Sequence, residues 1–354
     1  MPNTLGYSQY LSTFNEQIDK LSPSKEGESL VFVSLHMPEE MDHGYADRCK
    51  AMLEKLRNLG FRIIADVSKR SLKAFGAEDL EELRELLQLD IIRIDFGFSE
   101  EEIRSFAKQY PVGINASLIT EESVKILFED AVEVYAIHNF YPRPETGLDS
   151  EQFEKLNAML KAKHIKVAAF IPGDRFLRGP IFEGLPTLEN HRGVAPYAAF
   201  LDMSLRYGVD DVFVGDGVIE SLQVQWINTY LDEGIFTIPA VFEESAQALY
   251  GMTYTIRKDS PQSLMRLQES REYAHAGEII QPQRTIPRVK GSITLDNLKY
   301  MRYSGEIQIT KRDYPADERV NVIGYIPREY QLILELVPNA AKIRFVMAPN
   351  QDNG

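Results

Sequence analysis

The feature that most constrains the fold is a regular alternation of short apolar runs with amphipathic helical patterns, which continues to about residue 232. The runs are rich in β-branched and aromatic residues and are apolar on both faces, as buried parallel strands are. Eight such β/α units in a stretch of this length are typical of a TIM barrel. The expected strands span residues 5–11, 30–37, 61–68, 91–97, 112–119, 132–140, 166–173 and 210–217.

The segments between these runs carry helical periodicity. In 45–59, Cys49, Met52 and Leu56 share one face, and Gly60 follows as a C-terminal cap. Residues 79–89, DLEELRELLQL, repeat the pattern. A doubly wound open sheet is the alternative architecture. Its nucleotide-binding signatures, a GxGxxG turn after the first strand or a Walker loop, do not occur in this sequence, so the barrel is favoured.

From about residue 236 the rhythm changes to alternating apolar and polar residues, which indicates a half-solvated antiparallel sheet. The strand candidates are IFTIPAVF, MTYTIRK, GSITLDN, GEIQITKR, RVNVIGYI and KIRFVMA. One helix is expected among them, at 260–274. The sequence therefore predicts two domains, a TIM barrel over residues 1–234 and a smaller, mostly β barrel over residues 235–354.

Charge and composition limit the partners. The net charge of −14 disfavours nucleic acid and anionic membranes as ligands. No apolar run reaches the roughly 18 residues of a membrane span, and the first residues show no signal-peptide pattern. Cys49 is the one cysteine, so no intrachain disulfide can form, and no histidine pair has zinc-site spacing. We expect a cytoplasmic protein without a metal or cofactor.

Three aspartates follow different predicted strands, where the chemistry of a TIM barrel is located. They are Asp66, Asp95 and Asp216. Glycoside hydrolysis needs two carboxylates about 5 to 9 Å apart, one of them held protonated. We expect one of Asp95 and Asp216 to protonate the glycosidic oxygen while the other stabilises or attacks the anomeric carbon or activates water, with Asp66 as the third candidate. Alternatively, an aspartate at a strand end caps the next turn.

Ligand-binding residues are expected in the loops after the fifth, sixth and seventh strands. The loop HNFYPRPETGLD (138–149) is stiffened by Pro142 and Pro144, and its aromatics can stack on a sugar. Arginines in two of these loops suggest an anionic ligand, because guanidinium groups bind phosphate and carboxylate bidentately. Alternatively they pair with acidic residues of the same loops. The candidates are Asn115, His138, Asn139, Arg143, Arg178, Glu183 and Arg192.

Several motifs resemble those of one bacterial family. They occur in the same order as in the family, and together they cover nearly the whole chain. They are HNFYPRPETGL, RGPIFEGLPTLENHR, QESR (268–271), ITLDN (293–297), YSGEIQI (303–309) and ADERVNVIG (316–324). The family, once labelled "outer surface protein", is that of the 6-phospho-N-acetylmuramidases. The resemblance implies a TIM barrel followed by a cyclophilin-like β-barrel. It also implies cleavage of N-acetylmuramic acid 6-phosphate–N-acetylglucosamine inside the cell, in cell-wall recycling.

The implied substrate carries a phosphate and a lactyl carboxylate, and the loop arginines would bind these two anionic groups. In the second domain the motifs implicate Arg271, Asp296, Asn297 and Glu306, which either contact substrate or form a structural network. The sequence also allows attack by the substrate's own 2-acetamido group. A non-enzymatic protein that binds phosphosugars or a partner protein is the second hypothesis. A lyase or isomerase is the third, but it lacks a good candidate for a Schiff-base lysine.

Overall fold

The computed structural model describes residues 4–24, 26–35, 43–273 and 279–349, without the side chains of 271–273. The chain divides into two compact units, Met1–Val224 and Gln225–Gly354. The division falls inside helix α9 (Ser221–Glu233), ten residues before the boundary expected from the sequence. Each unit is described by itself below.

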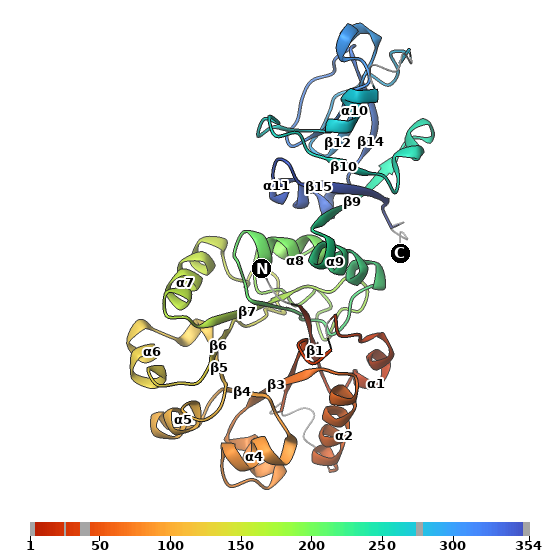
Figure 1. Cartoon of the computed structure of the whole chain (residues 1–354). Coiled ribbons are helices and arrows are strands. Elements are labelled where there is room, and N and C mark those ends of the chain that lie inside the picture. The colour runs from red at the N-terminus through yellow and green to blue at the C-terminus, as the bar shows by residue number, and fades with distance from the viewer. Residues whose placement is uncertain (1–3, 25, 36–42, 274–278, 350–354) are drawn as a thin grey trace. The chain divides into compact units, whose positions relative to one another are not determined.

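The first unit is a closed barrel of eight parallel strands in chain order (Figure 1). Each strand pairs with the next, and β1 also pairs with β8, which closes the ring. The predicted TIM-like barrel is thereby confirmed, and the open-sheet alternative is wrong. The strands are β1 (Leu5–Gln9), β2 (Leu30–Ser34), β3 (Arg62–Val67), β4 (Ile91–Ile94), β5 (Val112–Asn115), β6 (Val134–Ile137), β7 (Lys166–Ile171) and β8 (Asp211–Val214).

Helices surround this barrel at its periphery (Figure 1). Several begin at side-chain caps that the sequence supplies: Ser68, Ser99 and Thr120 each form a capping box. The barrel helices are α1 (Phe14–Gln17), α2 (Tyr45–Asn58), α3 (Lys69–Phe75), α4 (Leu80–Leu87), α5 (Glu100–Ala107), α6 (Glu121–Phe128), α7 (Ser150–Ala162), α8 (Pro196–Leu205) and α9.

Aromatic and aliphatic side chains fill the barrel interior. Phe32 of β2 packs edge-on against Phe170 of β7, with ring centroids 5.4 Å apart, and Phe213 of β8 lies 5.7 Å from Phe170. Ile64 and Ile137 belong to the same buried cluster, and Phe140, in the loop after β6, packs against it. Gly6 of β1 makes room for the Phe213 ring, since a Cβ at this position would lie 2.6 Å from it.

The second unit holds a seven-stranded curled sheet in the order β10-β15-β9-β14-β12-β13-β11. All its pairs are antiparallel except β15 with β9. The mostly β prediction is confirmed, whereas the cyclophilin-like character stays a prediction. The elements are β9 (Ile235–Phe242), β10 (Thr253–Thr255), β11 (Leu264–Arg266), α10 (Gln268–Tyr273), β12 (Ser292–Asp296), β13 (Ile307–Thr310), β14 (Val320–Tyr325), α11 (Ile333–Leu336) and β15 (Lys342–Met347).

The helix expected over 260–274 is wrong in its first half. Residues 264–266 form β11, which pairs with β13 through Leu264↔Thr310 and Arg266↔Gln308. Only 268–273 are helical. Strand pairing overrides the local helical pattern here, because the edge of β13 supplies hydrogen-bond partners for the backbone N–H and C=O groups of this segment.

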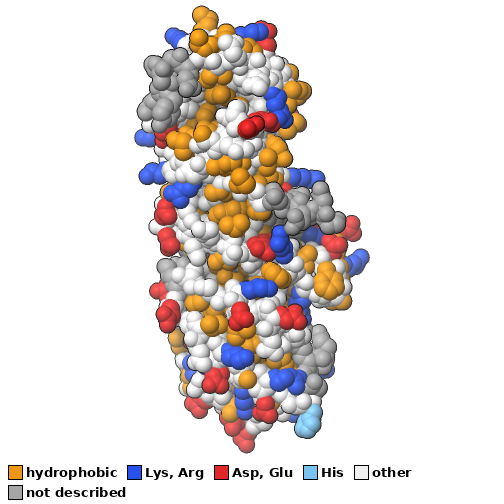
Figure 2. All heavy atoms as spheres, turned by 90° about the vertical axis from the view of Figure 1, so that its right-hand side faces the viewer, with side chains coloured by type: hydrophobic (Ala, Val, Ile, Leu, Met, Phe, Trp, Pro, Cys, Tyr) orange, Lys and Arg blue, Asp and Glu red, His pale blue; other side chains and the backbone are white. Residues whose placement is uncertain are grey.

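Acidic and basic side chains are mixed over the surface shown in Figure 2. Among the described residues that this view presents, no broad area of one charge stands out. No helix in the described ranges combines the length and apolarity of a membrane span.

Replacing Gly6 with alanine should lower the free energy of unfolding by about 1–3 kcal/mol, because the new methyl group overlaps the Phe213 ring. Chemical denaturation measures the loss. In a Phe213→Leu background, which lacks the ring, Gly6→Ala should lower the free energy of unfolding by less than it does in the wild type. Equal losses from Gly6→Ala in both backgrounds would show that the ring does not set this constraint.

Candidate functional site

A pocket of about 360 Å³ opens at the C-terminal ends of the barrel strands. Its lining comes from β2, β3, β4, β6 and β7 and from the loops that follow β1, β6 and β7. The position is the one at which TIM-barrel enzymes carry their active sites. The lining residues are Tyr10, Phe32, Ser34, Asp66, Arg93, Ile137, His138, Asn139, Phe140, Tyr141, Phe170 and Arg178.

A buried polar network crosses this pocket. Arg93 of β4 stands in register beside Asp66 of β3, and its Nη1 donates to Asp66 Oδ1 at 2.6 Å. Its Nη2 donates to Asn139 Oδ1 at 2.9 Å. Asp66 and Arg93 are 7% and 5% exposed, so both charges lie at low dielectric, where a partner offsets much of the desolvation cost. The network therefore fixes one carboxylate at the pocket wall.

Aromatic rings form the rest of the wall. Phe140 lies edge-on to Phe170 at 5.2 Å and to Tyr10 at 6.4 Å. Tyr10 is buried, and its hydroxyl donates to the carbonyl of Gly215 at 2.8 Å, which fixes the ring. A rigid aromatic wall beside a carboxylate suits a sugar, whose apolar C–H faces stack on rings while its hydroxyls need polar partners.

Asp216 supports the long loop after β7. Its Oδ2 accepts hydrogen bonds from the backbone N–H groups of Gly173 (2.7 Å) and Leu185 (2.9 Å). Its Oδ1 accepts one from the N–H of Arg178 at 2.8 Å. Burial raises the pKa of Asp216, and the three backbone donors oppose that shift. Asp216 is not part of the pocket lining, and its contacts are those of a loop anchor.

Asp95 and Asn115 follow β4 and β5 outside the pocket lining. Asp95 is half-buried, and its N–H donates to the carbonyl of Val67 at 2.9 Å. Asn115 caps the 3₁₀-helix η3 (Ala116–Leu118) by accepting from the N–H of Ser117 at 3.0 Å. Of the three predicted carboxylates, Asp66 thus lies in the pocket wall, Asp95 lies just after the neighbouring strand, and Asp216 lies under the loop.

Arg192 ties the loops after β6 and β7 together. It forms a bidentate pair with Glu189 at 2.7 and 2.9 Å. Glu189 also accepts from the N–H groups of Glu145 and Gly147 across the loops. The hydrogen bonds from Arg192 lower the pKa of Glu189 to about 2. The other contacts of Arg192 are to the carbonyls of Tyr141, Arg143, Glu183 and Gly184, at 2.9 to 3.4 Å.

His138 follows β6 and is fully buried. Its Nε2 lies 2.7 Å from Oδ1 of Asn157 on α7, and its ring packs 4.5 Å from Phe153. Burial lowers the pKa of the imidazole to about 4, against the opposing effect of the Asn157 hydrogen bond. His138 is therefore neutral near pH 7, and it connects the pocket to the helix behind it.

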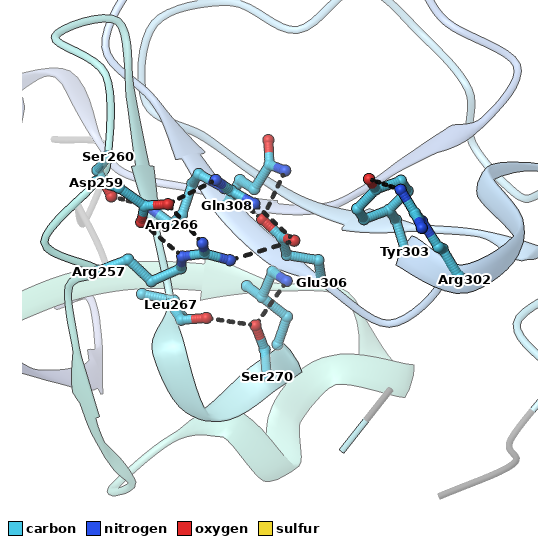
Figure 3. A network of polar contacts seen from close by, with 11 residues as sticks. Arg257, Asp259, Ser260, Arg266, Leu267, Ser270, Arg302, Tyr303, Glu306 and Gln308 are labelled. Atoms are coloured by element: carbon cyan, nitrogen blue, oxygen red, sulfur yellow. Dashed lines mark hydrogen bonds and ion pairs between the residues drawn. The ribbon is translucent and has the colours of Figure 1, made fainter. Parts of the chain in front are cut away.

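The second unit contains a separate polar network, shown in Figure 3. Arg266 of β11 makes a bidentate pair with the buried carboxylate of Glu306, and Gln308 donates to the same carboxylate at 3.3 Å. Burial and the neighbouring Glu306 raise the pKa of Asp296 to about 7. Asn297 donates to Asn321 at 2.9 Å. Arg271 lies on α10, and its side chain is outside the described residues.

Two important wall residues were not singled out from the sequence. Arg93 is the one charge inside the apolar segment IIRI of β4, and a charged residue in a buried strand is the signal that could have identified it. Tyr10 follows β1 directly. Among the described residues, no cluster of three or more His, Cys, Asp or Glu side chains could hold a metal ion.

The low pKa of His138 predicts a pH dependence of stability. Below pH 6.5 the unfolded histidine binds a proton, whereas the buried one stays neutral until about pH 4. The free energy of unfolding should therefore fall by about 2 kcal/mol between pH 7 and pH 5 through this group. Urea titrations of wild type and His138→Gln, which keeps an amide donor for Asn157, measure the difference. An equally large fall in the variant would contradict the assignment.

Comparisons with known proteins agree with this geometry. Residues 5–228 match the family model for the N-terminal part of 6-phospho-N-acetylmuramidase, and residues 236–346 match the model for its C-terminal part. A conserved protein of unknown function from Enterococcus faecalis is 33% identical. The match covers 97% of this chain and 96% of that one, with a TM-score of 0.84.

An uncharacterised B. cereus protein, 23% identical over 98% of this chain and 100% of that one, has the same fold with a TM-score of 0.76. No curated protein matches the sequence. The two family models together span nearly the whole chain in the expected order. The chain belongs to the 6-phospho-N-acetylmuramidase family.

Proposed function

We propose that this protein is a cytoplasmic glycosidase that releases N-acetylmuramic acid 6-phosphate from N-acetylglucosamine during peptidoglycan recycling. The observation that carries the proposal is the pocket at the strand ends, which joins a buried carboxylate–guanidinium pair to an aromatic wall. Membership of the family supports the substrate class. The pocket volume of about 360 Å³ lies in the range of small-molecule sites and suits one substituted sugar ring.

Asp66 takes the role of the ionised carboxylate in this proposal. Nη1 of Arg93 lies 2.6 Å from Asp66 Oδ1 and holds this carboxylate in place, and the second contact of Arg93, to Asn139, fixes the guanidinium in turn. An anion fixed in this way stabilises the positive charge that develops at the anomeric carbon. This revises the sequence-based ranking, in which Asp66 was the third candidate after Asp95 and Asp216.

Asp95 takes the role of proton donor. It comes two residues after Arg93, so strand alternation places it on the same side of β4 and nearer the barrel mouth. Hydrolysis breaks the bond between the anomeric carbon and the glycosidic oxygen. Asp95 gives its proton to that oxygen, water supplies the hydroxyl group at the anomeric carbon, and the remaining proton of that water returns to the Asp95 carboxylate. Asp216 has a positioning role, because its oxygens accept from three backbone N–H groups.

The alternative function is a protein that binds phosphosugars without turnover. It uses the same pocket, since an aromatic wall and fixed charges bind sugars whether or not a bond is cleaved. It differs in requiring no proton donor near the pocket. Turnover therefore separates the two functions.

Incubation of the purified protein with the 6-phosphorylated muramic acid–glucosamine disaccharide tests the proposal, with products followed by mass spectrometry. We expect cleavage of this disaccharide and little cleavage of its unphosphorylated form. Binding of the phosphorylated disaccharide without any cleavage by folded protein would favour the alternative.

Asp66→Asn should lower kcat by roughly 100-fold or more, because it removes the anion while keeping an oxygen that can accept from Arg93. Asp130→Asn is the matched control, since Asp130 is exposed in the turn before β6, at the opposite end of the barrel. Circular dichroism checks that both variants fold. A kcat for Asp66→Asn equal to that of the control would remove Asp66 from the mechanism.

A further inference from the structure

The side chain of Asn139 is fixed in one orientation by the network that crosses the pocket. Its Oδ1 accepts from Nη2 of Arg93 at 2.9 Å. A guanidinium group only donates hydrogen bonds, so the terminal atom of Asn139 that faces Arg93 is the amide oxygen. The amide nitrogen Nδ2, with its two N–H donors, is therefore the terminal atom that faces away from Arg93.

The backbone of Asn139 is fixed as well. Its carbonyl accepts from Oγ1 of Thr187 at 2.9 Å, and that hydroxyl in turn accepts from the N–H of Phe170 on β7 at 2.9 Å. Thr187 is fully buried, so these contacts join Asn139 to the neighbouring strand inside the protein. Side chain and backbone of Asn139 are thus positioned before any ligand arrives, which reduces the entropy lost on binding.

Nδ2 of Asn139 has no hydrogen-bond partner among the described residues. Within residues 4–24, 26–35, 43–273 and 279–349, the side chain of Asn139 makes its hydrogen bond through Oδ1, to Arg93. Nδ2 is also not one of the buried polar atoms that lack a partner in these ranges, so solvent reaches it. Because Asn139 lines the pocket, its N–H groups are available to a ligand there, and binding breaks no contact of the described residues.

The position of Asn139 points to the sugar substituent next to the anomeric carbon. Arg93 donates to Asp66 through Nη1 and to Asn139 through Nη2, so the two side chains lie one guanidinium group apart on the pocket wall. The proposed function places Asp66 beside the anomeric carbon. In a 2-acetamido sugar, the carbon next to the anomeric carbon carries the acetamido group, and the carbonyl oxygen of that group accepts hydrogen bonds.

The surroundings of Asn139 fit an acetamido group better than an anionic substituent. Its amide is a neutral donor, and an anion bound to it would lie close to the Asp66 carboxylate, whose charge already balances Arg93. Phe140, the next residue, also lines the pocket and offers an apolar surface to the methyl group of an acetamido substituent. The phosphate and lactyl groups of the proposed substrate leave the ring at carbons that are not adjacent to the anomeric carbon.

We propose that Asn139 recognises the 2-acetamido group of the bound sugar by donating from Nδ2 to its carbonyl oxygen, with Arg93 as the residue that positions the amide. The inference rests on the proposed function, which places the anomeric carbon at Asp66. It makes the pocket selective for N-acetylated sugars, because a 2-hydroxyl group is too short to reach the same point and has no methyl group to pack on the ring.

Isothermal titration calorimetry with two ligands tests this selectivity. One is N-acetylmuramic acid 6-phosphate, and the other is 3-O-lactylglucose 6-phosphate, which has a hydroxyl in place of the acetamido group and is otherwise the same. Wild type should bind the acetylated ligand about 10-fold more tightly, the gain expected from one hydrogen bond. The ratio of the two affinities is the readout, because the contributions of the phosphate and lactyl groups cancel in it.

Substitutions at Asn139 should abolish the preference for the acetylated ligand. Asn139→Asp keeps an oxygen for Arg93 and replaces the Nδ2 donor by a second oxygen, which repels the carbonyl. Asn139→Ala removes the donor without adding a charge, and it answers the question if Asn139→Asp does not fold. Asn190→Asp is the matched control and should keep the preference, since Asn190 is exposed in the loop after β7, outside the pocket lining.

The affinity ratio separates recognition from a structural role. A substitution that only disturbs Arg93 weakens the binding of both ligands alike and leaves the ratio unchanged. An unchanged ratio in the Asn139 variants would therefore overturn the proposal. So would a wild-type protein that binds the two ligands equally, or that binds neither of them.

This proposal and the proposed function can fail separately. Cleavage of the phosphorylated disaccharide by a wild-type protein without a preference for the acetylated ligand would remove the role of Asn139 alone. A preference that depends on Asn139, in a folded protein that cleaves no disaccharide, would support acetamido recognition and remove the glycosidase.

Discussion

The organisation of the pocket depends on one buried carboxylate at the end of β8. Asp216 is 1% exposed and accepts hydrogen bonds from three backbone N–H groups of the loop after β7. A buried carboxylate is costly unless its oxygens are hydrogen-bonded, and here the loop itself supplies the donors. Loop and carboxylate therefore stabilise each other, and the pocket wall that includes Arg178 follows from this arrangement.

A second buried interaction gives the pocket its chemical character. Most of the barrel interior is apolar, but the ends of β3 and β4 carry Asp66 and Arg93 as an ion pair. A buried ion pair is weak evidence for stability, because apolar residues of similar volume often serve a core as well or better. The pair lies in the pocket wall beside aromatic rings, and this is why we propose a role in ligand chemistry for it.

The barrel could be predicted because its strands are apolar on both faces and its helices repeat at regular intervals, so local patterns and the global fold agree. Strand ends also pointed to residues of the pocket lining, since Asp66, His138 and Asn139 lie there; their roles stay predictions. The structural contacts of Arg192 could not be predicted. Several arginines lie in these loops, and only the folded backbone determines that Arg192 meets Glu189 and the carbonyl of Tyr141 in the neighbouring loop.

The misassigned helix at 260–274 has a similar cause. Residues 264–266 join the sheet because β13 offers them an edge, and that edge comes from residues more than 40 positions away. Helical periodicity in a short window carries no information about such a partner. Likewise, strand order alone does not tell which of the three aspartates lines the pocket, and the structure places Asp66 there.

A crystal structure of Asp66→Asn with the phosphorylated disaccharide would test the central claim most directly, because the variant should hold the substrate without cleaving it. The account predicts a sugar ring against Tyr10, Phe140 and Phe170, with residue 66 beside the anomeric carbon. A disaccharide bound elsewhere, with this pocket empty, would contradict it.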